Sequence, residues 1–429
     1  MVLSQYCKIY LHPEDRGLVT LFSTRTMAVA NIATEVLRDI EHNKLSVKEK
    51  KTLDELGFLA QNAAAERREM LGSIEDLNDE DESFSAVVVL SLDCNLGCKY
   101  CFEGRRKGKF YMSAETADRF VDFITTQELD GKDELHVVFY GGEPLLSMDI
   151  ICRISEKLRI IAKKRKVKFK FSLITNGTLL TRRNLEILEP LWLEKASVTL
   201  DGPREVHDAF RPFKSGKGSF DAIISNVERA CSLIDVNING NYTVANFLEF
   251  PRLLDYLLDR GLTPDKIAAV DFSPVINERD EFAPLDFHDG CISLNEPWLC
   301  EATLFLREEI LKRGFPTQEL LPTICAIERR NSIIVNFDGT LYKCPVLIGK
   351  KDFCVGDLKT GALDYSRTHC LGNWKNEVCL ACSYLPLCFG GRRHMKLMQD
   401  GTMNGVNCRK EYFDKTLAQF VSQDIKYDL

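Results

Sequence analysis

Three cysteines, Cys94, Cys98 and Cys101, stand within eight residues at the spacing C-x3-C-x2-C. The apolar run 84–92 (FSAVVVLSL) leads directly into them and predicts a buried parallel strand that ends in a loop. Parallel α/β folds carry their chemistry on the loops at the carboxyl ends of their strands. Three thiolates on such a loop can hold an iron–sulfur cluster, and a four-iron cluster would keep one iron open to another ligand. A zinc loop short of one ligand and three unconnected cysteines are the alternatives.

The composition limits the classes of protein to which the chain can belong. Its 429 residues are too many for one ordinary core, so two or three domains are expected. The net charge of -7 argues against a general nucleic-acid binder, and no apolar run approaches the ~20 residues of a membrane span. Sixteen cysteines without an export signal indicate metal or redox use rather than disulfides. We therefore expect a cytoplasmic protein with no nucleic-acid and no membrane partner.

Residues 1–80 are expected to form a separate small α+β domain. Ser46 is a plausible N-cap for one of its helices. The acidic run 75–82 predicts a linker to the rest of the chain. Strands are predicted at 6–11 and 17–22, and helices at 33–41, 47–56 and 60–71.

From 84 to 276, six strand candidates alternate with helical stretches. This regularity predicts an α/β domain with a parallel sheet that curves toward a barrel. The strands are predicted at 86–92, 135–140, 169–175, 196–200, 236–243 and 268–273.

The residues that follow three of these strands carry groups suited to ligand binding. In Gly141-Gly142-Glu143-Pro144 the two glycines let the backbone approach a ligand closely, and Glu143 can accept from an ammonium group. Two further segments are Thr175-Asn176-Gly177-Thr178 and Thr199-Leu200-Asp201-Gly202-Pro203. Beyond them, Arg211 could bind a carboxylate with two hydrogen bonds. His207 and Asp208 fit either a helix cap or a catalytic role.

Together with Tyr100, these motifs resemble the signature of the radical S-adenosylmethionine (SAM) enzymes. The resemblance implies a partial (β/α)6 barrel with a [4Fe–4S] cluster on Cys94, Cys98 and Cys101. The open iron would bind SAM, and an electron from a low-potential reductant such as ferredoxin or flavodoxin would cleave SAM to a 5′-deoxyadenosyl radical. The resemblance assigns no catalytic residue. It implies that SAM is bound by Gly141, Gly142, Glu143, Asn176, Thr199, Asp201 and Arg211.

Beyond 276 the alternation stops. Residues 277–324 predict an inserted segment with Cys291, Cys300 and a helix at 297–312. Residues 325–429 carry a second set of cysteines and a hairpin around Asp338-Gly339.

This second set resembles the SPASM domain, which holds auxiliary iron–sulfur clusters in radical SAM peptide maturases. The resemblance implies one or two such clusters. Where the family pattern has a further cysteine, this chain has Arg392, and Cys354, Cys370, Cys291 or Cys300 could compensate. A structural zinc site is the alternative for the four cysteines of the distal cluster. The ligands implied for the nearer cluster are Cys325 and Cys344, and those for the distal cluster are Cys379, Cys382, Cys388 and Cys408.

The resemblance implies an enzyme that modifies a short precursor peptide with a leader sequence, with a thioether or another crosslink as the expected product. The segments 99–104 (KYCFEG) and 382–391 (CSYLPLCFGG) are similar to those of geopeptide maturases. Residues 1–80 resemble winged-helix-like leader-binding domains. A sulfatase-maturing, formylglycine-forming enzyme is a second interpretation. Against it, Pro345 stands where those enzymes have an aspartate that acts as a general base. A non-catalytic iron–sulfur or zinc electron-transfer protein is a third.

Overall fold

The computed structural model describes residues 1–12, 15–277, 284 and 286–428, so part of the predicted insertion lies outside the described residues. The chain divides into two compact units. One unit comprises 81–318 and 330–368, and the other comprises 1–80, 319–329 and 369–429. None of the described helices combines the length and the apolarity needed to cross a membrane.

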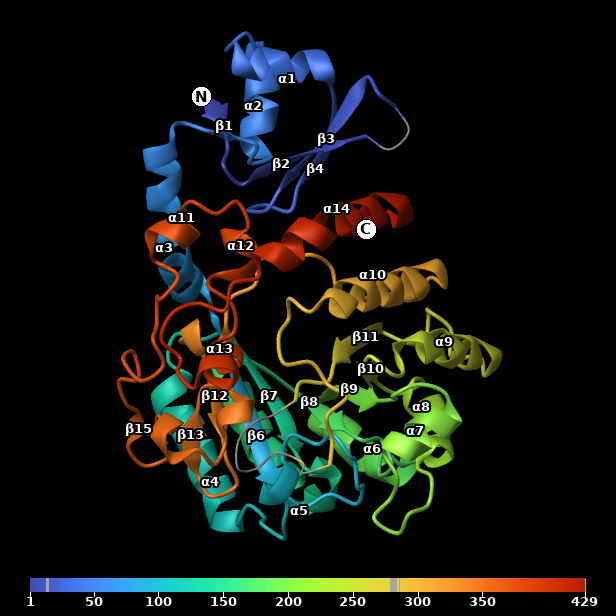
Figure 1. The fold of residues 1–429 in the computed structure, drawn as a ribbon. Coiled ribbons are helices and arrows are strands. Elements are labelled where there is room, and N and C mark those ends of the chain that lie inside the picture. The colour runs from blue at the N-terminus through green and yellow to red at the C-terminus, as the bar shows by residue number, and fades with distance from the viewer. Residues whose placement is uncertain (13–14, 278–283, 285, 429) are drawn as a thin grey trace. The chain divides into compact units, whose positions relative to one another are not determined.

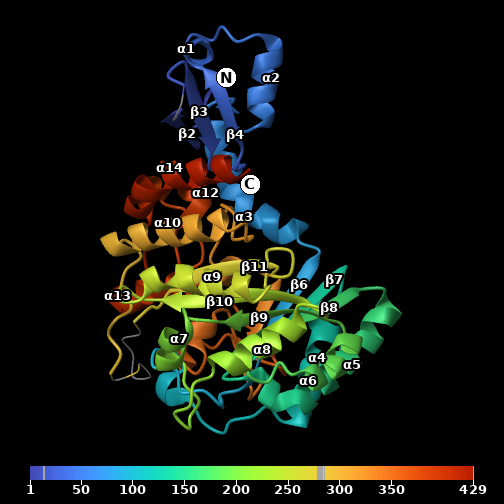
Figure 2. The same ribbon diagram turned by 90° about the vertical axis from the view of Figure 1, so that its right-hand side faces the viewer.

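The first unit is built on six parallel strands that neighbour one another in chain order (Figures 1 and 2). All six predicted strands and their parallel pairing are confirmed. The strands are β6 (Ser83–Ser91), β7 (Glu134–Gly141), β8 (Lys168–Thr175), β9 (Leu193–Thr199), β10 (Asp235–Tyr242) and β11 (Ala269–Pro274).

Helices between the strands cover the sheet and enclose its apolar core. In β7, Leu135, Val137 and Phe139 are buried at alternate positions, as expected for a strand with one face against helices. The helices are α4 (Ala114–Phe123), α5 (Met148–Arg165), α6 (Arg182–Leu188), α7 (Arg204–Phe210), α8 (Phe220–Ala230), α9 (Phe250–Asp259) and α10 (Pro297–Lys312), and η2 (Ile124–Glu128) is a π-helical extension of α4.

The sheet continues past β6 with strands that were expected in the cysteine-rich region 325–429. β12 (Ser332–Val335) pairs in parallel with β6, and the predicted hairpin to β13 (Thr340–Tyr342) is confirmed. β14 (Gly356–Asp357) and β15 (Gly361–Ala362) complete the sheet. The backbone groups at the edge of β6 need partners, and β12 supplies them. Residues 330–368 therefore belong to the barrel unit rather than to one domain with the later cysteines.

The second unit begins with the expected small α+β arrangement. β2 (Cys7–Leu11), β3 (Leu18–Ser23) and β4 (Val29–Ala33) form an antiparallel sheet, of which β4 was not predicted. The predicted cap is confirmed, because Ser46 and Glu49 form a capping box on α2 (Val47–Glu55). The remaining elements are α1 (Thr34–Glu41) and the short pair β1 (Val2–Leu3) and β5 (Leu59–Ala60).

The predicted linker at 75–82 is wrong, because α3 (Ala63–Glu80) runs through most of it. Met70 and Ile74 on α3 pack in one apolar core with Trp374, Leu380 and Phe389. Exposed charge therefore did not mark an unfolded segment, since the other face of the helix is buried. Residues 1–80 share this core with α11 (Glu377–Leu380) and α12 (Leu385–Cys388). The helices α13 (Arg393–Asp400) and α14 (Lys410–Tyr427) belong to the same unit.

Candidate functional site

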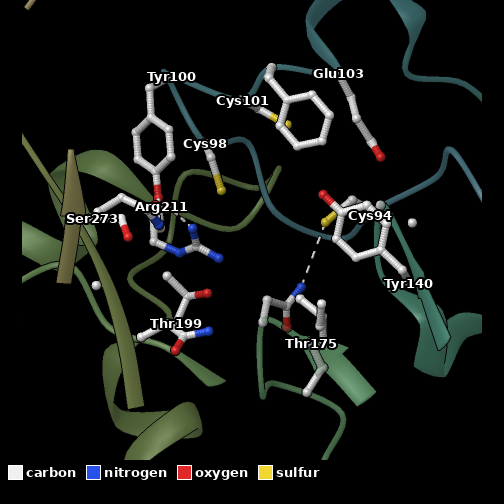
Figure 3. Close-up of a pocket in the computed structure, with 18 of the residues that line it drawn as sticks. Cys94, Cys98, Tyr100, Cys101, Glu103, Tyr140, Thr175, Thr199, Arg211 and Ser273 are labelled. Carbon is white, nitrogen blue, oxygen red and sulfur yellow. Dashed lines mark hydrogen bonds between the residues drawn. The ribbon is translucent and has the colours of Figure 1, made fainter. Parts of the chain in front are cut away.

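A cavity of about 350 Å³ lies at the carboxyl ends of the barrel strands, within the first unit. Cys94, Cys98 and Cys101 all line it (Figure 3). The structure brings to the same cavity five of the seven residues expected to bind SAM, but neither Glu143 nor Asp201 lines it. The five are Gly141, Gly142, Asn176, Thr199 and Arg211.

The cysteine loop is held by its neighbours on both sides. Asp93 Oδ1 accepts from the Cys94 backbone N–H and from Lys214 Nζ, both at 2.9 Å, and Asp93 Oδ2 accepts from Tyr111 Oη at 2.5 Å. Main-chain hydrogen bonds tie the loop to residues 210–214, with Gly97 N–H donating to Pro212 O at 2.8 Å and Lys99 N–H to Phe210 O at 3.1 Å. The loop therefore keeps its shape through contacts that do not involve the thiols.

The three thiols fit the donor set of a [4Fe–4S] cluster with one open iron. All three are free of disulfides, and Cys94 Sγ accepts from Asn176 Nδ2 at 3.6 Å. Burial raises the pKa of Cys94 to about 11, so its thiolate would form on metal binding. Burial would lower the pKa of Lys107, but the charges of the three cysteines outweigh burial and raise it. This ammonium is placed to balance the negative charge of thiolates and cluster.

No group of three His, Cys, Asp or Glu side chains in the described ranges is arranged to hold a single metal ion. Around one zinc ion, thiolates must stand about 3.8 Å apart, given Zn–S bonds near 2.3 Å. In a cluster each cysteine binds a different iron, so the thiols stand farther apart. Cys94, Cys98 and Cys101 line one cavity without forming such a single-ion group, which fits cluster ligation better than a zinc loop.

The GGEP segment lies against the cysteine loop. Gly142 N–H donates to Ser91 O at 2.9 Å, and Glu143 N–H donates to Asp93 O at 2.8 Å. A Cβ on Gly142 would stand 2.1 Å from Asp93 O, so only glycine allows this approach.

The Glu143 carboxylate is fully buried and joins two loops. It accepts from Asn176 N–H at 2.8 Å, Thr175 Oγ1 at 2.8 Å and Leu145 N–H at 3.0 Å. The side chain thus braces the loop after β7 against the loop after β8. Its expected contact with a SAM amino group stays a prediction.

Tyr100, Asp201, Arg211 and Asn241 form one buried network beside the cavity. Tyr100 Oη donates to Asp201 Oδ2 and accepts from Arg211 Nη1 at 2.5 Å and Asn241 Nδ2 at 3.0 Å. The Arg211 guanidinium lies 3.8 Å from Asp201, which has no exposed surface. Arg211 Nε is buried without a hydrogen-bond partner among the described residues. A cationic group with spare donors at the cavity wall fits the carboxylate of SAM.

His207 and Asp208 have structural roles. Asp208 Oδ1 accepts from Ser219 N–H at 2.8 Å and Phe220 N–H at 2.9 Å, so the helix-cap interpretation is confirmed at the start of α8. His207 is fully buried, with Nδ1 accepting from Asp201 N–H at 3.2 Å and Nε2 bonded to Ser219 Oγ at 3.0 Å. It supports the segment that carries Asp201 rather than lining the cavity.

Several cavity residues escaped the sequence prediction. Asn239 and Asn241 alternate on β10, and a polar residue at every second position of a buried strand is a signal that could have identified them. Asp271 and Ser273 on β11 follow the same rule. Tyr140 stacks on Phe102 at 6.5 Å and carried no such signal.

The four cysteines expected to hold the distal auxiliary cluster gather in the second unit. Burial raises the pKa of Cys379, and the charges of Cys408 and Cys382 raise it further. The pKa of Cys388 rises to about 12, through burial and through the charges of Cys382 and Cys379. Electrostatic interactions therefore link Cys379 to Cys382 and Cys408, and Cys388 to Cys379 and Cys382.

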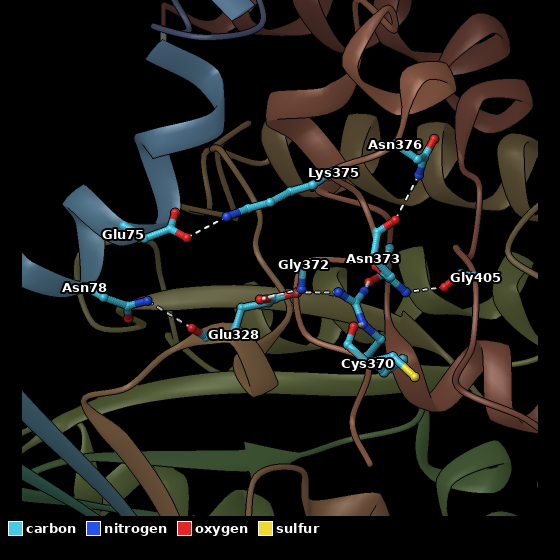
Figure 4. Close-up of polar contacts among 11 residues, drawn as sticks. Glu75, Asn78, Glu328, Cys370, Gly372, Asn373, Lys375, Asn376 and Gly405 are labelled. Atoms are coloured by element: carbon cyan, nitrogen blue, oxygen red, sulfur yellow. Dashed lines mark hydrogen bonds and ion pairs between the residues drawn. The ribbon is translucent and has the colours of Figure 1, made fainter. Parts of the chain in front are cut away.

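A buried ion pair supports the loop that precedes these cysteines (Figure 4). Arg393 and Glu328 pair with almost no exposure, and Glu328 also accepts from Gly372 N–H at 3.0 Å. On the N-terminal side, Asn78 Nδ2 donates to Glu328 O at 3.0 Å, and Lys375 Nζ pairs with Glu75 at 2.5 Å. Helix α3 thus braces the cysteine-rich segment.

The other expected auxiliary ligands are divided between the units. Cys325 and Cys370 belong to the second unit, and Cys344 and Cys354 to the barrel unit. Cys354 Sγ donates to Gly356 O at 3.2 Å. Arg392, at the expected position of a cysteine, is an exposed residue before α13.

Comparison with known proteins agrees with this geometry. Residues 88–248 match the family model of the radical SAM superfamily. The cysteine-type anaerobic sulfatase-maturating enzyme of Clostridium novyi is 25% identical over 387 residues, which cover 79% of this chain and 96% of that protein. A serine-type enzyme from Bacteroides thetaiotaomicron is 32% identical over 31% of this chain and 33% of its own.

Two groups of solved structures share the fold. The structure of anSMEcpe with bound AdoMet and Kp18Cys peptide has a TM-score of 0.64 at 17% identity, covering 80% of this chain and 99% of that one. Streptococcus suis SuiB bound to its precursor peptide SuiA has a TM-score of 0.55 at 16% identity, covering 95% of this chain and 98% of SuiB.

Proposed function

We propose that this chain, a radical SAM enzyme that uses a [4Fe–4S] cluster and SAM, modifies a small ribosomally made precursor peptide. When bound, the cluster and SAM supply a 5′-deoxyadenosyl radical that abstracts a hydrogen atom. The expected product is a crosslinked peptide, for example one with a thioether. The observation that carries the peptide substrate is the likeness to peptide-bound SuiB over 95% of the chain, far beyond residues 88–248.

In this proposal each motif of the cavity has a separate task. Cys94, Cys98 and Cys101 would hold the cluster, while Arg211 binds the carboxylate of SAM. Gly141, Gly142, Asn176 and Thr199 border the space that SAM would occupy. Tyr100 and Asp201 keep the guanidinium of Arg211 in place through their hydrogen bonds.

The N-terminal part of the second unit is proposed to bind the leader of the peptide. β2 and β4 are the two edge strands of its sheet, and an extended peptide can add to such an edge. Ile9 and Leu11 on β2 are exposed, with 41% and 88% of their surface accessible. The remaining expectations, a cytoplasmic location and auxiliary clusters on the later cysteines, stay predictions of the same proposal.

The test uses protein reconstituted anaerobically with iron and sulfide. It is mixed with SAM, dithionite and short peptides encoded beside its gene, with and without their leaders. We expect 5′-deoxyadenosine to form together with a peptide that has lost two hydrogen atoms, faster for leader-bearing peptides. If SAM is cleaved but no peptide changes mass, the enzyme class stands and the peptide substrate is wrong.

Sulfatase maturation is the second candidate, favoured by the match to 96% of the Clostridium novyi enzyme. Against it, Cys344 is followed by Pro345, which cannot act as the base that was expected at this position. A sulfatase-derived peptide with a central cysteine decides between the candidates. Conversion of that thiol to an aldehyde would replace crosslinking as the proposed reaction.

A further inference from the structure

We propose that the surface around the cysteine loop is the docking site for an acidic one-electron carrier of the flavodoxin class. The inference rests on the radical SAM chemistry proposed above, because only a cluster that must be reduced needs such a partner. It adds the place of docking and the residues that form it. Four lysines and two aromatic residues make up this surface, called here the basic face: Lys99, Lys109, Lys214, Lys217, Phe110 and Tyr111.

The local sequence is strongly basic in an acidic chain. Residues 93–111 contain five basic and two acidic residues, and residues 211–217 contain three basic residues and no acidic one, although the net charge of the chain is -7. Asp93 offsets only the charge of Lys214, with which it is paired, and Glu103 is buried with 5% exposure. The positive charges of Lys99, Lys109 and Lys217 are therefore presented to solvent.

The tertiary structure joins the two segments into one surface. Lys214 N–H donates to Asn95 O at 3.0 Å, and Lys99 N–H donates to Phe210 O at 3.1 Å. Asp93 then links Lys214 to Tyr111 through its two carboxylate oxygens. These contacts place the lysines of both segments around the loop that carries Cys94, Cys98 and Cys101.

The basic face presents exposed lysines and exposed aromatic residues that a partner protein could contact. Lys99, Lys109 and Lys217 are exposed and form no ion pair with any described residue. Phe110 and Tyr111 have 50% and 44% of their surface accessible, although large aromatic residues are usually buried. Aromatic groups among cations are typical of the centre and rim of a transient interface. Lysine charges would steer an acidic carrier to the cluster and set its arrival rate.

The electron balance needs only this carrier. One electron would pass from the reduced flavin of the carrier to a cluster held by Cys94, Cys98 and Cys101, and no bond would form or break in that step. The carrier would depart oxidised by one electron, and that electron would go on to SAM.

The test compares two reductants on the reconstituted full-length enzyme. Reduced flavodoxin must dock, whereas photoreduced 5-deazariboflavin is small and almost uncharged. The variant Lys109→Glu/Lys217→Glu reverses two charges of the basic face without touching a cysteine or a cavity residue. Its matched control is Lys164→Glu/Lys166→Glu. These two lysines are exposed and lie at the C-terminal end of α5, just before the amino end of β8.

At low salt, we expect flavodoxin to reduce the cluster of the basic-face variant about tenfold more slowly than the cluster of the wild type or of the control. The difference should vanish near 0.5 M salt, where charges are screened within about 4 Å. Binding of oxidised flavodoxin, measured by calorimetry, should weaken in parallel. Reduction by deazariboflavin should stay within about twofold of wild type.

Equal flavodoxin rates and affinities for the two double variants would overturn the docking site. That outcome is distinct from a failure of the proposed chemistry. If deazariboflavin reduces the cluster of the wild-type enzyme but SAM is not cleaved, the radical SAM function itself is wrong.

Discussion

At the scale of single residues, the site combines residues that line the cavity with residues that fix their positions. Cys94, Cys98 and Cys101 line the cavity, whereas Asp93 and Asn176 fix the position of Cys94 through hydrogen bonds. The buried charges are similarly divided. Arg211 lines the cavity, and Asp201 behind it has no exposure and keeps the guanidinium oriented.

Cys98→Ala is expected to abolish SAM cleavage, because two thiolates hold a four-iron cluster poorly. Iron per chain should fall by about four, and the cluster signal that responds to SAM should disappear. Cys231→Ala is the control, since Cys231 is half-buried at the end of α8, away from the cavity lining. Measured SAM cleavage by Cys98→Ala at the wild-type rate would contradict the ligand assignment.

His207 makes stability depend on pH. Ser219 Oγ donates to Arg211 O at 2.7 Å, so it accepts from His207 Nε2, while His207 Nδ1 accepts from Asp201 N–H. The ring is therefore neutral, and burial holds the pKa of His207 well below its usual range. The unfolded chain binds a proton near pH 6.5, so the free energy of unfolding should fall by about 1.4 kcal/mol per pH unit below that value.

The measurement is thermal unfolding between pH 7 and pH 5. His207→Gln keeps a neutral acceptor and donor, so its melting temperature should fall less than that of wild type on acidification. His42→Gln, at an exposed position, should follow wild type. Equal pH profiles for His207→Gln and wild type would show that His207 is already protonated in the folded chain.

At the scale of elements, the site is made where loops after neighbouring strands meet. The loop after β7 donates from Gly142 N–H and Glu143 N–H to the end of β6 and to Asp93. Glu143 then connects this loop to the loop after β8. Because the strands are parallel and adjacent, their carboxyl ends lie at one edge, and three separate sequence motifs become one cavity.

Gly142→Ala tests the contact between the first two loops. Its Cβ would stand 2.1 Å from Asp93 O, so the loops must separate, at a cost of about 1–3 kcal/mol. We expect a lower melting temperature, and iron that is lost more readily to a chelator. Gly131→Ala is the control: its added Cβ meets nothing within 4 Å, so it loses stability only through its φ of +70° and should retain its iron. Iron retention by Gly142→Ala equal to that of the control would argue against tight contact.

At the scale of the whole molecule, the two units are each assembled from distant parts of the sequence. Residues 1–80 share a core with 369–429, and residues 330–368 extend the sheet of the barrel. Met70 and Ile74 of α3 lie in the same apolar cluster as Trp374 and Phe389. The N-terminal region is therefore part of the support of the Cys379–Cys408 segment.

Deleting residues 1–80 should impair the distal cysteine site as well as leader binding. The deletion exposes Trp374, Leu380 and Phe389, which pack against α3 in the intact chain. We expect about four fewer irons per chain than in the full-length protein, with the SAM-responsive signal retained. Arg67→Ala removes only the exposed pair with Glu377 and should keep full iron content, since such pairs contribute little. A deletion variant with full iron content would show that α3 is dispensable for that site.

Sequence patterns were sufficient for the barrel and for most of the cavity. The six strands, the hairpin at 332–342 and the helix 297–312 follow from local periodicity and turn residues. The cavity residues Cys94, Gly142 and Arg211 were found because they stand in short motifs at strand ends. Asn239 and Asp271 were not found, since they stand in no short motif and are marked only by polar residues at every second position of a strand.

The sequence by itself determined the parallel barrel, its cysteine loop and the glycine-rich turns, because each depends on neighbours within a few residues. Only the tertiary structure decided that β12 joins β6, that α3 packs with the C-terminal helices, and that Glu143 braces two loops. Those contacts depend on free backbone edges, buried faces and charge partners that lie tens or hundreds of residues apart. No local pattern records which partner will satisfy them.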